Sequence, residues 1–166
     1  LCRLAHEEHG LATVVLRTAR FFPEDDDTLR TPSGPNLKAN EFLNRRLTVR
    51  DVARGHLAAL ERAPALGYAM YLLSAPTPFQ RTDAQPLIDD VVSVIAHYFP
   101  DAPEIYKKRG WVLPERIERV YDSQRSRDLL GLDYETDFAA VLDALRSGAE
   151  LPFEHDASYT SPRVTE

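Results

Sequence analysis

Residues 45–60 read RRLTVRDVARGHLAAL, and this stretch decides the fold class. The Thr and Val within Arg46–Val49 pack well on a pleated surface, so we expect a short strand there. Asp51 follows, and we expect its carboxylate to cap a helix by accepting a hydrogen bond from a free backbone N–H group. The side chains expected on the buried face of this helix recur at helical spacing: Val52, His56, Leu57 and Leu60. A strand followed by a capped, amphipathic helix predicts one half of an α/β unit.

Two further strands are predicted around this unit. The segment 11–22 (LATVVLRTARFF) has a nearly continuous apolar run, as in a parallel strand that is buried on both faces. Pro23 ends it, and an acidic, proline-bearing loop follows as far as Asn36; such long irregular stretches are often functional. Residues 68–73 (YAMYLL) form the next predicted strand. Helices are expected to begin at three capping residues, which are Asp83, Ser123 and Asp137.

The chain is predicted to form one folded portion over residues 1–150. Residues 1–8 read as the last turns of a helix that ends at His9-Gly10, because Gly readily adopts the conformation that follows a helix end. With no initiator Met, this start leads us to expect a fragment that lacks its N-terminal part. Residues 151–166 lack hydrophobic periodicity and are expected to form a flexible tail.

Composition and motifs exclude several classes of function. The net charge of −6 argues against a nucleic-acid partner. No apolar run approaches the roughly 18 residues that a membrane span needs, so no membrane partner is expected. Cys2 is the single cysteine and has no internal partner, which favours a reducing, cytoplasmic location. No metal site is expected, because His6 and His9 lack the zinc-helix spacing and the carboxylates of 24–27 suit a solvated loop.

Four segments follow one another in an order and spacing that resemble a known family. They are Val15–Pro23 (VLRTARFFP), Leu47–Ala53 (LTVRDVA) with His56 and Ala59-Leu60, Tyr68–Ser74 (YAMYLLS), and Arg119–Asp122 (RVYD) running into Leu130-Gly131. In these segments the chain is similar to the C-terminal half of the extended short-chain dehydrogenase/reductases, the NAD-dependent epimerase/dehydratase family.

The resemblance implies an α/β fold: the C-terminal part of a Rossmann-like, doubly wound domain. The chain would supply the last parallel strands and a small substrate-binding subdomain, whereas the nucleotide-binding half would lie upstream of Leu1. That missing half would hold the glycine-rich loop for NAD or NADP and the Tyr/Lys pair that acts as acid/base. No catalytic residue is therefore expected in this chain, and the chain alone is not expected to bind NAD(H). The family also implies that the full-length protein can form a homodimer.

The resemblance also implies two sets of site residues. The expected substrate-binding residues are Arg20, Arg45, Arg46 and Arg119, and the expected cofactor-binding residues are Thr18, Ala19 and Phe22. Arg20 stands where epimerases of nucleotide sugars usually have an Asn, and its guanidinium can hold a phosphate or carboxylate through two parallel hydrogen bonds. Arg45 and Arg46 lie near another family arginine, but the register is off by one, so that Asn44 takes the aligned place.

Each assignment has a simpler alternative. Arg119 and Asp122 can form a local salt bridge, and Arg20 can be a surface charge at a strand end. Asp51 is expected to cap a helix rather than to act in catalysis. His56 is expected to be an interior histidine with satisfied hydrogen bonds.

Three functions remain open from the sequence. The first is the substrate-binding half of an NAD(P)-dependent epimerase/dehydratase or reductase, whose small-molecule substrate is a sugar or resembles a nucleotide sugar. The full-length protein would then be the enzyme and the fragment inactive alone. The second is a non-catalytic module that senses a cofactor or acts as a scaffold on the same fold, and the third is a free-standing α/β binding module.

Overall fold

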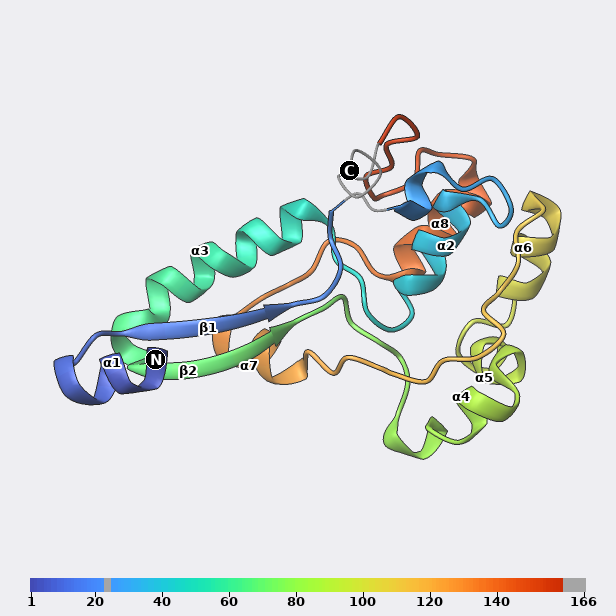
Figure 1. Ribbon diagram of the computed structural model, residues 1–166. Helices are drawn as coiled ribbons and strands as arrows, with labels where there is room; N and C mark the ends of the chain where they lie inside the picture. Colours follow the sequence, from blue (N-terminus) through green and yellow to red (C-terminus); the bar gives the residue numbers. More distant parts are fainter. Residues whose placement is uncertain (23–24, 160–166) are drawn as a thin grey trace.

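The computed structural model describes residues 1–22 and 25–159, and its centre is a parallel two-stranded sheet (Figure 1). Strand β1 (Thr13–Thr18) pairs with β2 (Tyr68–Leu73) in a register that runs from Thr13 opposite Tyr68 to Thr18 opposite Leu73. Helix α3 (Val49–Leu66) connects the two strands along the sheet. The predicted α/β class is therefore confirmed, with a mixed α/β fold built on this small parallel sheet.

The start of α3 differs from the prediction by three residues. Its N-cap is Thr48, whose hydroxyl oxygen accepts a hydrogen bond from the Asp51 backbone N–H at 3.1 Å. Asp51 is buried in the first turn, where one carboxylate oxygen accepts from the Thr48 hydroxyl and the other from the Glu135 backbone N–H. The expected strand over 46–49 shortens to a single bridge between Arg46 and Arg20, because Val49 already belongs to the helix.

The predicted buried face of α3 is confirmed for Val52 and wrong for His56, Leu57 and Leu60. The residues that are buried along this helix are Asp51, Val52, Gly55 and Ala59. Leu60 is 72% exposed, and His56 is exposed with its Nδ1 bonded to a backbone carbonyl one turn earlier in the helix. Gly55 explains why the helix turns a different face to the sheet than the one predicted. A Cβ atom at this position would lie 2.6 Å from the Leu73 side chain, so the helix places its small residues against the sheet.

One face of the sheet is covered and the opposite face is largely open. On the covered face, α3 approaches Leu73, and Arg125 of α7 (Gln124–Leu130) lies 5.6 Å from the Tyr71 ring. On the other face, α1 (Cys2–His9) contacts β1 and lies beside the beginning of β2, where Tyr68 stacks on His6, and Met70 is 46% exposed. Parallel sheets are normally covered on both faces, so this face has room for a further layer.

The remaining helices form a second packed group beyond the carboxyl ends of the strands (Figure 1). They are α2 (Gly34–Glu41), α4 (Pro86–Asp89), α5 (Val91–Tyr98), α6 (Ala102–Arg109) and α8 (Phe138–Ser147), with 3-10 turns at Asp25–Thr28 and Arg81–Asp83. The helix expected after Asp83 is thus divided, and Asp90 caps its second part, α5. The cap at Asp137 is confirmed, whereas the Ser123 side chain makes no capping hydrogen bond.

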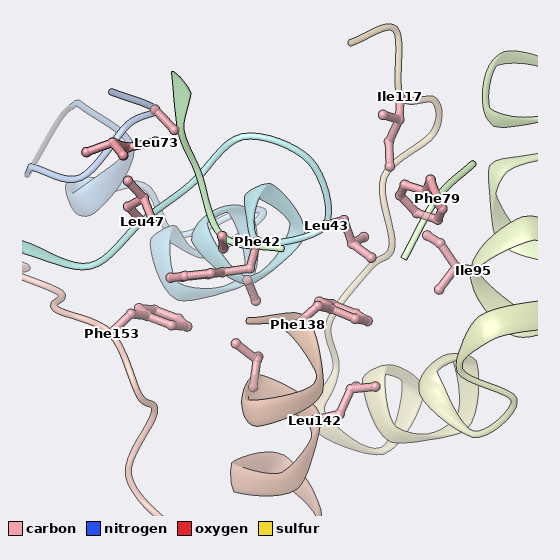
Figure 2. Close-up of a cluster of buried hydrophobic side chains, with 14 of the residues drawn as sticks. Phe42, Leu43, Leu47, Leu73, Phe79, Ile95, Ile117, Phe138, Leu142 and Phe153 are labelled. Atoms are coloured by element: carbon pink, nitrogen blue, oxygen red, sulfur yellow. The ribbon is translucent and has the colours of Figure 1, made fainter. Parts of the chain in front are cut away.

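A continuous hydrophobic core joins this helical group to the sheet (Figure 2). Phe42 and Leu43 follow α2 and face Phe138 and Leu142 of α8, while Leu47 and Leu73 extend the cluster to the strands. Phe79, Ile95 and Ile117 continue it on the side of α5. The segment 110–123, which has no regular structure, is therefore anchored to the core at Ile117.

The first part of the tail expected over 151–166 makes contacts with the rest of the fold. Phe153 is buried and stacks on Phe42 with ring centroids 5.4 Å apart (Figure 2). The Glu154 carbonyl accepts a hydrogen bond from the Lys38 side chain at 3.0 Å, and the Asp156 backbone N–H donates to Asp27 at 3.0 Å. Periodicity cannot detect such an anchor, because one aromatic ring and the backbone supply it. Residues 160–166 of the predicted tail lie outside the described residues.

Candidate functional site

Three of the predicted arginines lie together at the carboxyl end of the sheet. Arg20 comes two residues after β1, and its carbonyl accepts a hydrogen bond from the Leu47 backbone N–H at 2.9 Å. The Arg46 carbonyl in turn accepts from the Ala75 backbone N–H at 2.9 Å. The segment around Arg46 is therefore inserted between the diverging ends of the two strands. In open α/β sheets, ligands bind beyond this end of the strands.

Glu41, the last residue of α2, contacts all three of these arginines. Its Oε1 accepts a hydrogen bond from Arg20 Nη1 and forms an ion pair with Arg45 Nη2 at 3.1 Å. Its Oε2 accepts from Arg46 Nη1 at 2.7 Å. The Arg46 side chain is only 3% exposed, whereas that of Arg45 is 44% exposed. Arg46 thus lies beneath the surface, and Arg45 and Arg20 lie at it.

Three adjoining cavities open beside this cluster, and Ile117 lines all of them. The first, about 290 Å³, is lined by Arg20, Leu37, Asn40, Glu41, Asn44, Arg45, Pro114, Arg116 and Ile117. The second, about 470 Å³, shares four of these residues and adds Glu118 and Arg119. The third, about 980 Å³, continues from Arg119 towards Thr77, Phe79, Gln80 and Arg81. Arg46 is not among the residues that line them.

Arg119 lines both the second and the third cavity and belongs to the segment that links α6 to α7. Its guanidinium makes no hydrogen bond or ion pair with any residue that the structure describes. The local salt bridge with Asp122 does not form, because the Asp122 carboxylate accepts from the Gln124 backbone N–H instead. The side chain is therefore available to a ligand in either cavity.

Arg116 and Asn40 are among the lining residues that were not predicted from the sequence. Arg116 faces the first two cavities and pairs with Glu118 at 3.0 Å on the exposed rim. Asn40 donates from its amide to the Val112 carbonyl at 3.0 Å, while its Oδ1 is buried and has no hydrogen-bond partner among the described residues. The only signal for Arg116 was its position three residues before Arg119. The sequence carries no signal for Asn40, because the carbonyl that it binds is 72 residues away.

The residues expected to contact a cofactor lie near the same end of the sheet. Thr18 is the last residue of β1, opposite Leu73. Ala19 is buried, and its backbone N–H donates to the Leu73 carbonyl at 2.8 Å, which leaves little of it to contact a ligand. Phe22 is 51% exposed and packs edge-on against Phe21. Glu24, in the acidic loop, lies outside the described residues.

A hydrogen-bonded pair lies beside the 980 Å³ cavity. The Tyr98 hydroxyl donates to the Asp83 carboxylate at 2.6 Å, and this bond lowers the pKa of Asp83 and raises the pKa of Tyr98. Asp83 also accepts from the backbone N–H of Gln80, which lines that cavity. The pair therefore fixes the loop that forms one wall.

Other classes of site are not seen in the described parts of the chain. Over residues 1–22 and 25–159, no group of three or more His, Cys, Asp or Glu side chains could hold a metal ion. Among the helices of the same residues, none is long and apolar enough to cross a membrane. The arginine-lined cavities are thus the candidate site, and their chemistry suits an anion.

No protein-family model and no curated protein matches the sequence, and no solved structure matches the fold. The resemblance to the epimerase/dehydratase family therefore rests on the residues of this chain alone. Any assignment of function must be argued from the geometry of the cavities and the sheet.

Proposed function

We propose that the chain is the substrate-binding part of an NAD(P)-dependent epimerase/dehydratase or reductase whose substrate carries an anionic group. The observation that supports this most directly is the set of four arginines, Arg20, Arg45, Arg116 and Arg119, around adjoining cavities at the carboxyl end of two parallel strands. The chain as a whole carries a net charge of −6, whereas the described lining of the first two cavities holds these four arginines and two glutamates, Glu41 and Glu118. Guanidinium groups bind phosphates and carboxylates through paired hydrogen bonds.

Asn40 supports a substrate that also carries hydroxyl groups. Asn40 lines the 290 Å³ cavity, and its Oδ1 is a buried acceptor that lacks a donor among the described residues. A buried polar atom without a partner costs stability, so a ligand that donates to it gains affinity. A sugar phosphate or nucleotide sugar offers both features, because it places hydroxyl donors beside an anionic group.

The open side of the sheet supports a larger doubly wound domain. Within the described residues, β1 and β2 pair only with each other, and Met70 is exposed on the face that α1 leaves uncovered. A two-stranded parallel sheet gains its usual cover when further strands and a second layer of helices are added. A dinucleotide-binding half would supply both.

Of the three expected cofactor-binding residues, two support a contact with a cofactor. Thr18 lies at the strand end, and the exposed Phe22 ring can form one wall against a flat ring, whereas Ala19 is buried. When bound, NAD or NADP supplies hydride transfer. In this arrangement the arginines of the chain bind and orient the anionic group, and the cavities enclose the rest of the substrate.

Calorimetric titration of the 166-residue chain with UDP-glucose, glucose 1-phosphate and uncharged glucose tests the proposal. Binding of the two phosphorylated ligands is expected, with a loss of about tenfold in Arg45→Ala and in Arg119→Ala, since a hydrogen bond to a charged group is worth about 1.5 kcal/mol or more. Arg3→Ala is the matched control, because Arg3 lies over Tyr68 at the opposite end of β2. Equal weakening by Arg3→Ala, or equal binding of glucose, would contradict an anion site in these cavities.

A further inference from the structure

We infer that the outer face of helix α3 is the interface of an antiparallel dimer with a second copy of this chain. This face, the α3 stripe, consists of exposed side chains along one side of the helix: Val49, Ala53, His56, Leu57, Leu60 and Pro64. None of these residues lines the arginine-lined cavities, so the inference is independent of the proposed function.

The α3 stripe is apolar although it is exposed. Leu57 is 60% exposed, Leu60 is 72% exposed and Val49 is 47% exposed. The helix meets the sheet with a different face, on which Gly55 approaches Leu73. A surface helix normally turns charged and polar residues away from its buried face, and a continuous apolar patch on a surface marks a site of protein contact. Helix α3 thus has two apolar faces, and the fold of one chain buries only one of them.

The spacing of the α3 stripe suits another helix as its partner. Val49, Ala53, His56 and Leu60 follow one another at the alternating spacings of four and three residues that form the seam of a coiled coil. Helix α3 has 18 residues, so the stripe runs along a straight surface that is about 27 Å long. A second helix can follow such a surface over about four turns.

The order of the residues in the α3 stripe selects a second copy of α3 as that helix. We place two α3 helices antiparallel, with a two-fold axis that passes just after His56. Ala53 then lies opposite Leu60 of the second copy, so that a small side chain meets a large one. Val49 lies opposite Pro64 of the second copy. The stripe therefore faces itself along its whole length, as the contact between two copies across a two-fold axis requires.

The charges beside the α3 stripe are complementary in the same arrangement. Arg50, Arg54 and Glu61 lie on one flank of the stripe, because they are separated by whole turns of the helix. Glu61, which is exposed, comes opposite Val52 of the second copy and thus lies between the positions of Arg50 and Arg54 there. The two arginine side chains are 75% and 40% exposed and can reach it. A parallel pair would instead place Glu61 beside Glu61, so the charges favour the antiparallel one.

Sedimentation equilibrium of the 166-residue chain tests the dimer. The face of a single helix makes a small interface, so we expect a dissociation constant on the order of 10 µM. Leu60→Glu should weaken the dimer about a hundredfold, because each dimer buries two copies of this side chain. Leu129→Glu is the matched control, since it makes the same change at a leucine of α7 that is 46% exposed, and it should dimerise like the wild type.

Three results of this experiment would overturn the inference. A wild-type chain that stays monomeric well above the expected dissociation constant has no such interface. A dimer that survives Leu60→Glu uses another surface. If Leu60→Glu and Leu129→Glu weaken the dimer alike, the added negative charge is the cause, and the α3 stripe is not the contact.

A disulfide between the two copies tests the antiparallel arrangement. Cys2 is the single cysteine, so Cys2→Ser provides a background without thiols. In that background, His56→Cys places a thiol beside the two-fold axis, and oxidised glutathione should link two chains into a dimer on a non-reducing gel. Leu129→Cys in the same background is the control and should remain a single chain. If His56→Cys forms no more linked dimer than Leu129→Cys, the antiparallel arrangement is wrong.

Discussion

The Asn44 side-chain amide donates a hydrogen bond to the Arg119 backbone carbonyl at 2.8 Å, across 75 residues of sequence. The Asn44 carbonyl accepts a second bond, from the Tyr121 backbone N–H, also at 2.8 Å. Asn44 thus fixes the segment that presents Arg119 to the cavities.

Asn44→Ala should therefore weaken pyrophosphate binding while the protein remains folded. The variant loses one hydrogen bond, which costs about 1 kcal/mol in the free energy of unfolding. The affinity should fall because Arg119 is no longer held in one position. Calorimetry and urea unfolding measure the two effects. A variant with lower stability and unchanged affinity would show that Asn44 serves only the fold.

Arg46→Met should mainly lower the stability of the protein, whereas Arg45→Ala should mainly weaken binding. Removal of the buried Arg46 breaks a buried ion pair and should cost about 3 kcal/mol in the free energy of unfolding. Removal of the half-exposed Arg45 should cost less than about 1 kcal/mol and should weaken pyrophosphate binding. Urea unfolding of both variants tests this prediction. Equal losses in the free energy of unfolding would mean that the difference in burial between the two arginines has no energetic consequence.

A prediction of similar kind concerns the buried ion pair of Lys38 with Asp27, whose side chains are 1% and 0% exposed. Lys38→Met leaves the charge of Asp27 without this partner and should cost about 3–5 kcal/mol in the free energy of unfolding. The double variant Asp27→Asn/Lys38→Met should recover part of that loss, because no charge then remains buried. A double variant as unstable as Lys38→Met would indicate that the charge of Asp27 is not the cause.

Local patterns were sufficient to predict the α/β unit. The apolar run around Val15 and the segment 68–73 both form strands, because each pattern reports burial on a pleated surface. The rotation of α3 could not be predicted in this way. Leu57 and Leu60 have the hydrophobicity of buried residues, yet the contact between Gly55 and Leu73 determines which side meets the sheet.

Local sequence patterns were also insufficient to predict the arrangement of the candidate site. The family pattern named Arg45 and Arg46 together, but only the insertion of this segment between the strand ends buries one and exposes the other. Glu41 joins three arginines, and Asn40 binds a carbonyl 72 residues away. These relationships depend on tertiary contacts between distant segments, which periodicity and spacing do not encode.

Tyr98→Phe tests the pair beside the 980 Å³ cavity through its pH dependence. The Tyr98 hydroxyl is the main cause of the lowered pKa of Asp83, so the variant should raise that pKa towards the ordinary aspartate value. A group whose pKa is lowered by folding stabilises the protein above its unfolded pKa, and this contribution is lost as the pH falls through the folded pKa. The wild type should therefore exceed the variant in stability at pH 7 by more than it does near pH 2.

Carboxyl ¹³C NMR titration measures this pKa directly in both proteins. Asp90 is the internal control, because its pKa is lowered by a hydrogen bond from Ser93 and not by the tyrosine. If Asp83 titrates at the same pH in the wild type and in Tyr98→Phe, the hydroxyl does not stabilise the carboxylate. The wall of the cavity would then be held by the bond from Gln80 to Asp83 without the tyrosine.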